Sequence, residues 1–193
     1  MKPIFKNLFT LGVITAVLSV ATVLTKNRGV SSFQTEQPQF EGKAQASAPP
    51  INWEIVKPAY DGDTITVKKG GEKLKVRFSC IDAPELKQQL GRDSRDYLRT
   101  LISSSGGRVG LNVITTDRYG RSVAEVWVQN DGTPELVQSK MVLAGMAYGY
   151  ERYKSDCPSW DAVKASQEYA KSNKIGLWAG NYQKPWEYRK RNK

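Results

Sequence analysis

Histidine is absent from the 193-residue sequence. Its absence excludes Ser-His-Asp and Cys-His nucleophilic sites, histidine general bases and almost every zinc enzyme site. If the protein is an enzyme, carboxylates must therefore supply both the general base and the metal ligands. Carboxylate oxygens suit Ca²⁺ or Mg²⁺ rather than zinc.

Long hydrophobic runs are scarce, and the prominent one lies at the N-terminus. Residues 8–24 are apolar and have lysines before them and basic residues after them. This pattern predicts a secretory signal, with a candidate cleavage site at residues 19–21. An uncleaved membrane anchor is the alternative, and a buried helix of the domain is a third interpretation. We expect residues 1–24 to be a signal peptide or signal anchor. The protein would then be secreted, periplasmic or anchored at the outer face of a membrane.

Cysteine is rare, with only Cys80 and Cys157 in the chain. In an exported protein an even pair of cysteines is compatible with a disulfide. Two buried free thiols are the alternative. A bridge across so long a loop could stabilise the fold by roughly 3–5 kcal/mol.

Acidic residues are fewer than basic ones: 19 Asp and Glu stand against 29 Lys and Arg, for a formal net charge of +10. This surplus favours a polyanionic partner such as nucleic acid, because phosphates attract such a surface. Simple solubility accounts for the charge equally well.

The length predicts one domain with extensions. Residues 25–50 are polar, rich in Ser, Gln and Pro, and without periodicity, so we expect a disordered linker. The domain is expected over residues 51–180. Residues 181–193 form a basic tail that we expect to be flexible.

The domain has strand-like and helix-like segments. Alternating apolar residues predict five strands, and Gly70-Gly71 predicts a hairpin between the second and third. These strands are expected over residues 53–60, 63–69, 73–81, 108–114 and 122–129. Helices are expected over 94–103 and 159–172, with another that has Thr133 as N-cap and ends at Gly145. We therefore expect an α+β fold class: a five-stranded OB-fold β-barrel with three α-helices.

The first polar cluster is the sequence "YDGDT". Asp61 and Asp63 lie two residues apart, so in extended geometry they project to one side. Two facing carboxylates repel each other unless a cation or donor lies between them. Metal binding and an ordinary Asp-Gly-Asp turn both remain open.

The second cluster follows the predicted strand at 73–81. Pro84 restricts the residue before it to extended geometry, so Asp82 and Glu85 leave the strand in a defined orientation. They could serve as metal ligand and general base, or as part of a loop with a surface ion pair. Arg77 lies on the opposite side of a regular strand from Asp82, so a twist or bulge would be needed to bring them together.

The third cluster is the sequence "DRYGR". Gly120 suits a left-handed turn position, and Arg121 begins the next predicted strand. Its guanidinium could bind a phosphate through two hydrogen bonds, although a charged hairpin tip is the alternative. Together the three clusters supply what metal-assisted phosphodiester hydrolysis needs: carboxylates for a cation, a further carboxylate to activate water, and arginines for the phosphate.

In this order and spacing, "DGDT", "VRF…IDAPE" and "DRYGR" resemble the staphylococcal nuclease (thermonuclease) family over about residues 53–178. The resemblance implies an OB barrel and hydrolysis of DNA and RNA with one Ca²⁺ ion, leaving 3′-phosphate ends. It implies Asp63, Asp82 and the Ala83 carbonyl as Ca²⁺ ligands, with Asp61 behind them. The resemblance also implies that Glu85 acts as general base or positions the water, and that Arg77 and Arg121 bind the phosphate.

The sequence also departs from the staphylococcal enzyme. The loop at 86–94 is shorter, and Glu151 replaces a tyrosine that packs near the nucleotide. Candidates for stacking on substrate bases are Tyr119, Tyr148, Tyr150 and Tyr153, with edge packing of the barrel as the alternative for the last three.

We therefore expect an exported, monomeric, sugar-nonspecific nuclease, with possible membrane association through its N-terminal segment. A catalytically silent OB module that binds nucleic acid, and a calcium-stabilised structural domain, are the competing hypotheses.

Overall fold

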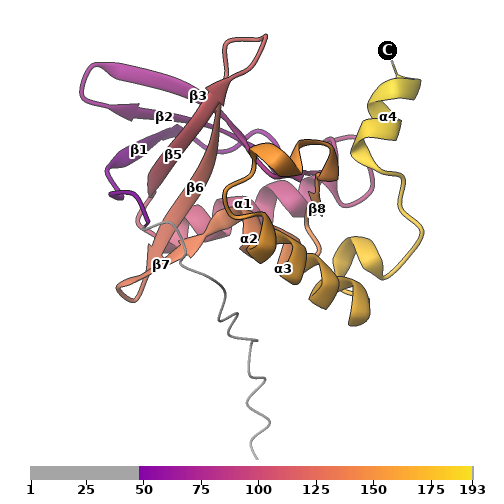
Figure 1. Ribbon diagram of the computed structural model, residues 1–193. Coiled ribbons are helices and arrows are strands. Elements are labelled where there is room, and N and C mark those ends of the chain that lie inside the picture. The colour runs from indigo at the N-terminus through magenta and orange to yellow at the C-terminus, as the bar shows by residue number, and fades with distance from the viewer. Residues whose placement is uncertain (1–47, 193) are drawn as a thin grey trace, which may run out of the picture. The chain divides into compact units, whose positions relative to one another are not determined.

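The computed structural model describes residues 48–192 (Figure 1). The predicted signal segment and most of the predicted linker lie outside these residues. Within 48–192, no helix combines the length and apolar character needed to cross a membrane.

A six-stranded sheet forms the centre of the domain, in the order β3-β2-β1-β5-β6-β7. A further parallel pairing joins β3 to β6, so that β3, β2, β1, β5 and β6 form a closed circuit of paired strands. β4 and β8 pair separately as a two-stranded antiparallel sheet. The strands are β1 (Trp53–Lys57), β2 (Thr64–Lys69), β3 (Glu72–Phe78), β4 (Ile81–Asp82), β5 (Arg108–Thr116), β6 (Ser122–Asn130), β7 (Thr133–Leu136) and β8 (Tyr148–Gly149).

Alternation along the strands decides which side chains face the core. Ile65 and Val67 of β2 are buried, as are Val76 and Phe78 of β3, while the lysines that precede or follow these pairs are exposed. The predicted β2–β3 hairpin is confirmed by the pairing of Lys69 with Glu72. Burial of these branched and aromatic side chains stabilises the closed arrangement of strands.

Residues 48–192 also contain four α-helices and two short 3₁₀ helices, with α2 packed against α3 and α1 (Figure 1). They are α1 (Gly91–Ser104), α2 (Val137–Leu143), α3 (Trp160–Ser172), α4 (Pro185–Arg191), η1 (Glu151–Asp156) and η2 (Gly176–Trp178). α1, expected over residues 94–103, buries Leu98, Leu101 and Ile102, which share one face at helical spacing.

Two predictions about the later part of the chain were wrong. Residues 133–136 form strand β7, which pairs with β6 at the edge of the sheet, and the helix begins at Val137. Pro134 fits an edge strand because it has no N–H to donate to a further neighbour. The basic tail was expected to be flexible, yet it contains α4, with Pro185 in its first turn.

Candidate active site

The Asp61–Asp63 loop lies between β1 and β2 and packs tightly against its surroundings. Gly62 is buried, and a Cβ atom there would lie 1.9 Å from the Ser94 Oγ and 2.7 Å from the Ala83 Cβ. Only glycine fits this approach without displacing a neighbour. The loop is thereby held against α1 and against the segment that carries Asp82.

Arg77 joins the first two polar clusters. Its Nη1 lies 2.9 Å from the Asp63 Oδ2, and its Nη2 lies 2.8 Å from the Asp82 Oδ1. The Ala83 N–H also donates to the Asp63 Oδ2, at 2.7 Å. The carboxylates of Asp63 and Asp82 therefore contact one guanidinium, although Asp63 lies in the loop before β2 and Asp82 ends β4.

The meeting of Arg77 and Asp82 depends on a break between β3 and β4. Cys80 has a left-handed backbone, with φ of 68°, and the Ile81 N–H donates to the Ser79 carbonyl at 2.8 Å. The predicted strand over 73–81 is thus interrupted after Phe78, which cancels the strict alternation of sides. This is the irregularity that the sequence required for Arg77 to reach Asp82.

The electrostatics of these acids favour a bound cation. Burial, and then the adjacent Asp63 charge, raise the pKa of Asp61 to about 6. Burial also raises the pKa of Asp82, against the opposing effect of Arg189 and Arg77. Crowded, partly desolvated carboxylates are relieved by a positive ion between them. The all-oxygen donor set fits a hard cation such as Ca²⁺, so these residues are compatible with the ion implied by the family resemblance.

Glu85 begins a compact loop that leads into α1. Its N–H donates to the Gln88 Oε1 at 2.9 Å, and its carbonyl accepts from the Gln88 N–H at 2.8 Å. Gly91 packs onto this turn, since a Cβ there would lie 2.0 Å from the Glu85 carbonyl oxygen. The backbone of Glu85 is therefore fixed, while its half-buried side chain extends towards Asp82 and α4.

The structure adds Arg189 to the site, a residue that the sequence interpretation missed. From α4, its Nη2 lies 2.7 Å from the Asp82 Oδ2, and its Nη1 lies 2.9 Å from the Glu85 Oε1. These partners raise the pKa of Arg189 further above its ordinary value, despite the opposing effect of burial. The only sequence signal was an excess of basic residues after Pro185, which indicates no particular contact.

Arg121 lies at the base of the β5–β6 hairpin. Its Nη2 is 2.7 Å from the Asp117 Oδ2, and Asp117 also accepts from the backbone N–H groups of Tyr119 and Arg121. Gly120 has φ of 73°, as expected for the turn. Among residues 48–192, the ion pair of Arg121 is with Asp117 rather than with the acids around Arg77.

The four tyrosines differ in exposure. Tyr119 is 68% exposed at the hairpin tip and Tyr153 is 48% exposed, whereas Tyr148 is only 1% exposed. Tyr148 contacts Trp178 and Trp186 edge-on, with ring centroids 5.4 and 5.9 Å away. Tyr150 is half-buried and stacks on Trp186, with centroids 5.3 Å apart and an interplanar angle of 15°. Base stacking on Tyr148 or on this face of Tyr150 would require Trp186 to move.

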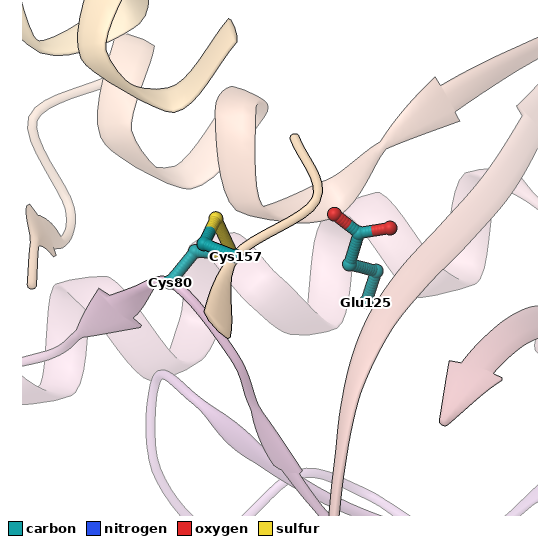
Figure 2. A group of neighbouring side chains, drawn as sticks. All are labelled: Cys80, Glu125 and Cys157. Carbon is teal, nitrogen blue, oxygen red and sulfur yellow. A yellow bond between two sulfur atoms is a disulfide. The ribbon is translucent and has the colours of Figure 1, made fainter. Parts of the chain in front are cut away.

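Cys80 and Cys157 form a disulfide with a Cα–Cα distance of 5.3 Å (Figure 2). The bridge links the end of η1 to the break before β4, where the Tyr150 N–H also donates to the Cys80 carbonyl at 2.7 Å. Buried Glu125 lies next to it but accepts hydrogen bonds from Asn112 and the Ser159 N–H. Because both sulfurs are bonded to each other, we interpret this trio as structural rather than as a metal site.

Comparison with known proteins identifies the family. Residues 75–180 match the family described as "Staphylococcal nuclease homologue". This stretch includes Arg77, Asp82, Glu85 and Arg121, and it begins after Asp61 and Asp63.

Several curated proteins are similar to the chain over most of their own length. A protein of Escherichia coli O157:H7 named "Uncharacterized endonuclease" is 37% identical over 132 residues, which cover 68% of this chain and 80% of that protein. A protein of Shigella flexneri named "Micrococcal nuclease" is 32% identical over 139 residues, covering 69% of this chain and 78% of that protein. With the matched domain and these relatives, the chain belongs to the staphylococcal nuclease homologue family.

Proposed function

We propose that the protein is a nuclease that hydrolyses phosphodiester bonds of DNA and RNA with one Ca²⁺ ion and leaves 3′-phosphate ends. The observation that carries the proposal is the bridge made by Arg77 between Asp63 and Asp82, with Glu85 joined to Asp82 through Arg189. Acids and arginines of this kind meet the needs of phosphoryl chemistry. The names of the similar proteins support the same class of reaction.

Asp63, Asp82 and the Ala83 carbonyl would hold the cation, with Asp61 behind them. When bound, Ca²⁺ polarises the phosphate and offsets its negative charge. Asp61 would add its negative charge to the site. Its carboxylate is held in place by a hydrogen bond from the Asp63 N–H, at 3.2 Å.

Glu85 would accept a proton from the attacking water as the oxygen of that water bonds to phosphorus. The bond from phosphorus to the 5′ oxygen would break as that oxygen takes up a proton from solvent, and Glu85 would then release its own proton to solvent. The products are a 3′-phosphate and a 5′-hydroxyl. Arg77 and Arg121 would exchange part of their carboxylate contacts for phosphate oxygens, where a guanidinium can donate two parallel hydrogen bonds.

The closed circuit of five strands would be the OB barrel of the family. Contacts to backbone phosphates carry little sequence information, so cleavage would be sugar-nonspecific and sequence-tolerant. The protein would be exported, monomeric, and either released or held at a membrane by residues 1–24. Tyr119 and Tyr153, with exposed rings, are the tyrosines best suited to stack on bases without rearrangement.

Cleavage of single-stranded DNA and RNA with Ca²⁺, with Mg²⁺ and with chelator tests the proposal. Glu85→Gln should lower the Ca²⁺-dependent rate about 10²–10⁴-fold, the usual contribution of a general base. Glu187→Gln is the matched control, because Glu187 is an exposed acid of α4. Salt-sensitive DNA binding without cleavage would instead favour the silent binding module. Ca²⁺ binding without DNA affinity would favour a structural domain.

A further inference from the structure

Arg189 uses the carboxylate oxygens that the proposed function assigns to the cation and to water activation. The Asp82 side chain is 0% exposed. Its Oδ2 accepts from the Arg189 Nη2 at 2.7 Å, and its Oδ1 accepts from both Arg77 at 2.8 Å and Arg189 at 3.1 Å. The Glu85 Oε1 accepts from the same Arg189 guanidinium at 2.9 Å. One arginine thus occupies two acids at once.

The segment that carries Arg189 is fixed by aromatic contacts. Trp186 stacks on Tyr150 at 5.3 Å, and the Lys184 Nζ lies 3.6 Å from the ring centroid of Tyr148. The Gln88 Nε2 donates to the Gln183 carbonyl at 3.0 Å, so the residues just before α4 are joined to the loop after Glu85. The same short segment therefore covers both the acids and the faces of two tyrosines.

α4 itself is short and at least partly exposed along most of its length. α4 spans only seven residues, so it depends on packing rather than on its own helical propensity. The Arg189 side chain is 41% exposed, and Pro185 is the only residue of α4 that is buried. Short, partly exposed segments of this kind can open locally at a lower free energy than global unfolding requires.

We propose that α4 is an autoinhibitory cap, in which Arg189 competes with the divalent cation for Asp82 and Glu85. The inference rests on the proposed cation site. A guanidinium hydrogen-bonded to both Asp82 oxygens takes up one acceptor position on each, and its positive charge repels a second cation. Trp186 covers Tyr150 while the cap is closed. The phosphates of a nucleic acid offer Arg189 alternative partners, so substrate and cation would open the cap together.

Calcium binding by the full chain tests the cap, measured by isothermal titration calorimetry without nucleic acid. Arg189→Gln should bind Ca²⁺ more tightly than the natural chain by about five-fold or more, the lower end of ordinary coupling between sites. Arg191→Gln is the control, because it removes the same charge from an exposed position two residues further along. Its Ca²⁺ affinity should match that of the natural chain.

A second variant separates the cap from the charge of Arg189 itself. Trp186→Ala keeps the guanidinium but removes the stacking on Tyr150, so it should also tighten Ca²⁺ binding. In the natural chain, Ca²⁺ should change tryptophan fluorescence as Trp186 leaves Tyr150, and Trp186→Ala should lose that change.

The possible failures are distinguishable. Equal Ca²⁺ affinities in the natural chain, Arg189→Gln and Trp186→Ala would overturn the cap and leave the proposed nuclease site intact. Weaker binding in Arg189→Gln would also overturn it, because Arg189 would then support the cation site. No Ca²⁺ binding by any of the proteins would overturn the cation of the proposed function, and the cap with it.

Discussion

The guanidinium of Arg189 lies 2.7 Å from the carboxylate of Asp82, although 107 residues separate them in the sequence. Asp82 also contacts Arg77, so a single buried carboxylate joins the start of the domain to its C-terminal helix. Two arginines on one acid form a coupled network, in which changing one partner alters the others.

Replacing Arg77 should affect both stability and cleavage. Arg77→Gln leaves the Asp63 and Asp82 carboxylates without their shared partner. We expect the free energy of unfolding to fall by about 3 kcal/mol, the lower end for a broken buried pair, because Arg189 still contacts Asp82. Urea unfolding in chelator measures this cost. Added Ca²⁺ should recover part of it, since a ligand that binds only the folded state stabilises it.

Arg77→Lys should not restore cleavage, because an ammonium lacks the planar pair of donors. Full cleavage by Arg77→Lys would contradict the phosphate-binding role.

Gly62 should tolerate no side chain. In Gly62→Ala the new methyl group would lie 2.7 Å from the Ala83 Cβ as well as 1.9 Å from the Ser94 Oγ. The Ser94 side chain can rotate away, but the Ala83 Cβ moves only with its backbone. We therefore expect the free energy of unfolding to fall by about 1–3 kcal/mol, as for other overpacked sites. Ca²⁺ binding should also weaken, because Asp61 and Asp63 would be displaced. Gly71→Ala is the control, since a Cβ there meets no atom within 4 Å. Comparable effects of the two substitutions would argue against a packed metal-binding loop.

Removing the disulfide should destabilise the domain. Replacing both cysteines with alanine frees a loop with a sequence separation of 77, for which the chain-entropy model gives about 4–5 kcal/mol. Chemical denaturation of the natural and double-mutant chains measures the difference. The reductant dithiothreitol should lower the stability of the natural chain alone. If both proteins unfold at the same denaturant concentration, the bridge contributes no stability.

Ionisation of the Tyr148 hydroxyl should make the stability of the fold depend on pH in the alkaline range. Burial, followed by the charges of Glu187 and Tyr182, raises the pKa of Tyr148 from 10.0 to about 12. The unfolded chain therefore loses this proton first, and stability should fall as the pH rises from about 10 to about 12. The hydroxyl also has no hydrogen-bond partner among residues 48–192. Tyr148→Phe should therefore be about 1 kcal/mol more stable near neutral pH and lose less stability above pH 10. An identical pH profile for both proteins would contradict this.

Part of the candidate site could be predicted from the sequence because its acids and Arg77 lie in short, local motifs, whereas Arg121, expected at the same site, pairs with Asp117. The structure brings Asp63, Asp82 and Arg77 together, and Glu85 joins them through Arg189. The left-handed Cys80 that makes this possible could not be predicted, because a non-glycine residue with positive φ is uncommon.

Features that depend on distant contacts were missed. Residues 133–136 resemble a helix start, and only their pairing with β6 makes them a strand. The tail appeared flexible because its charge pattern contains no sign of Trp186 stacking on Tyr150 or of Arg189 reaching Asp82. A contact across 107 residues leaves no periodicity in the sequence.

The most direct test of the central claim is end-group analysis of a single-stranded DNA oligonucleotide cut by the full chain with Ca²⁺. The account predicts products with 3′-phosphate and 5′-hydroxyl ends, formed only with the ion and lost on adding chelator. Products with 5′-phosphate ends, or cleavage that persists in chelator, would contradict it.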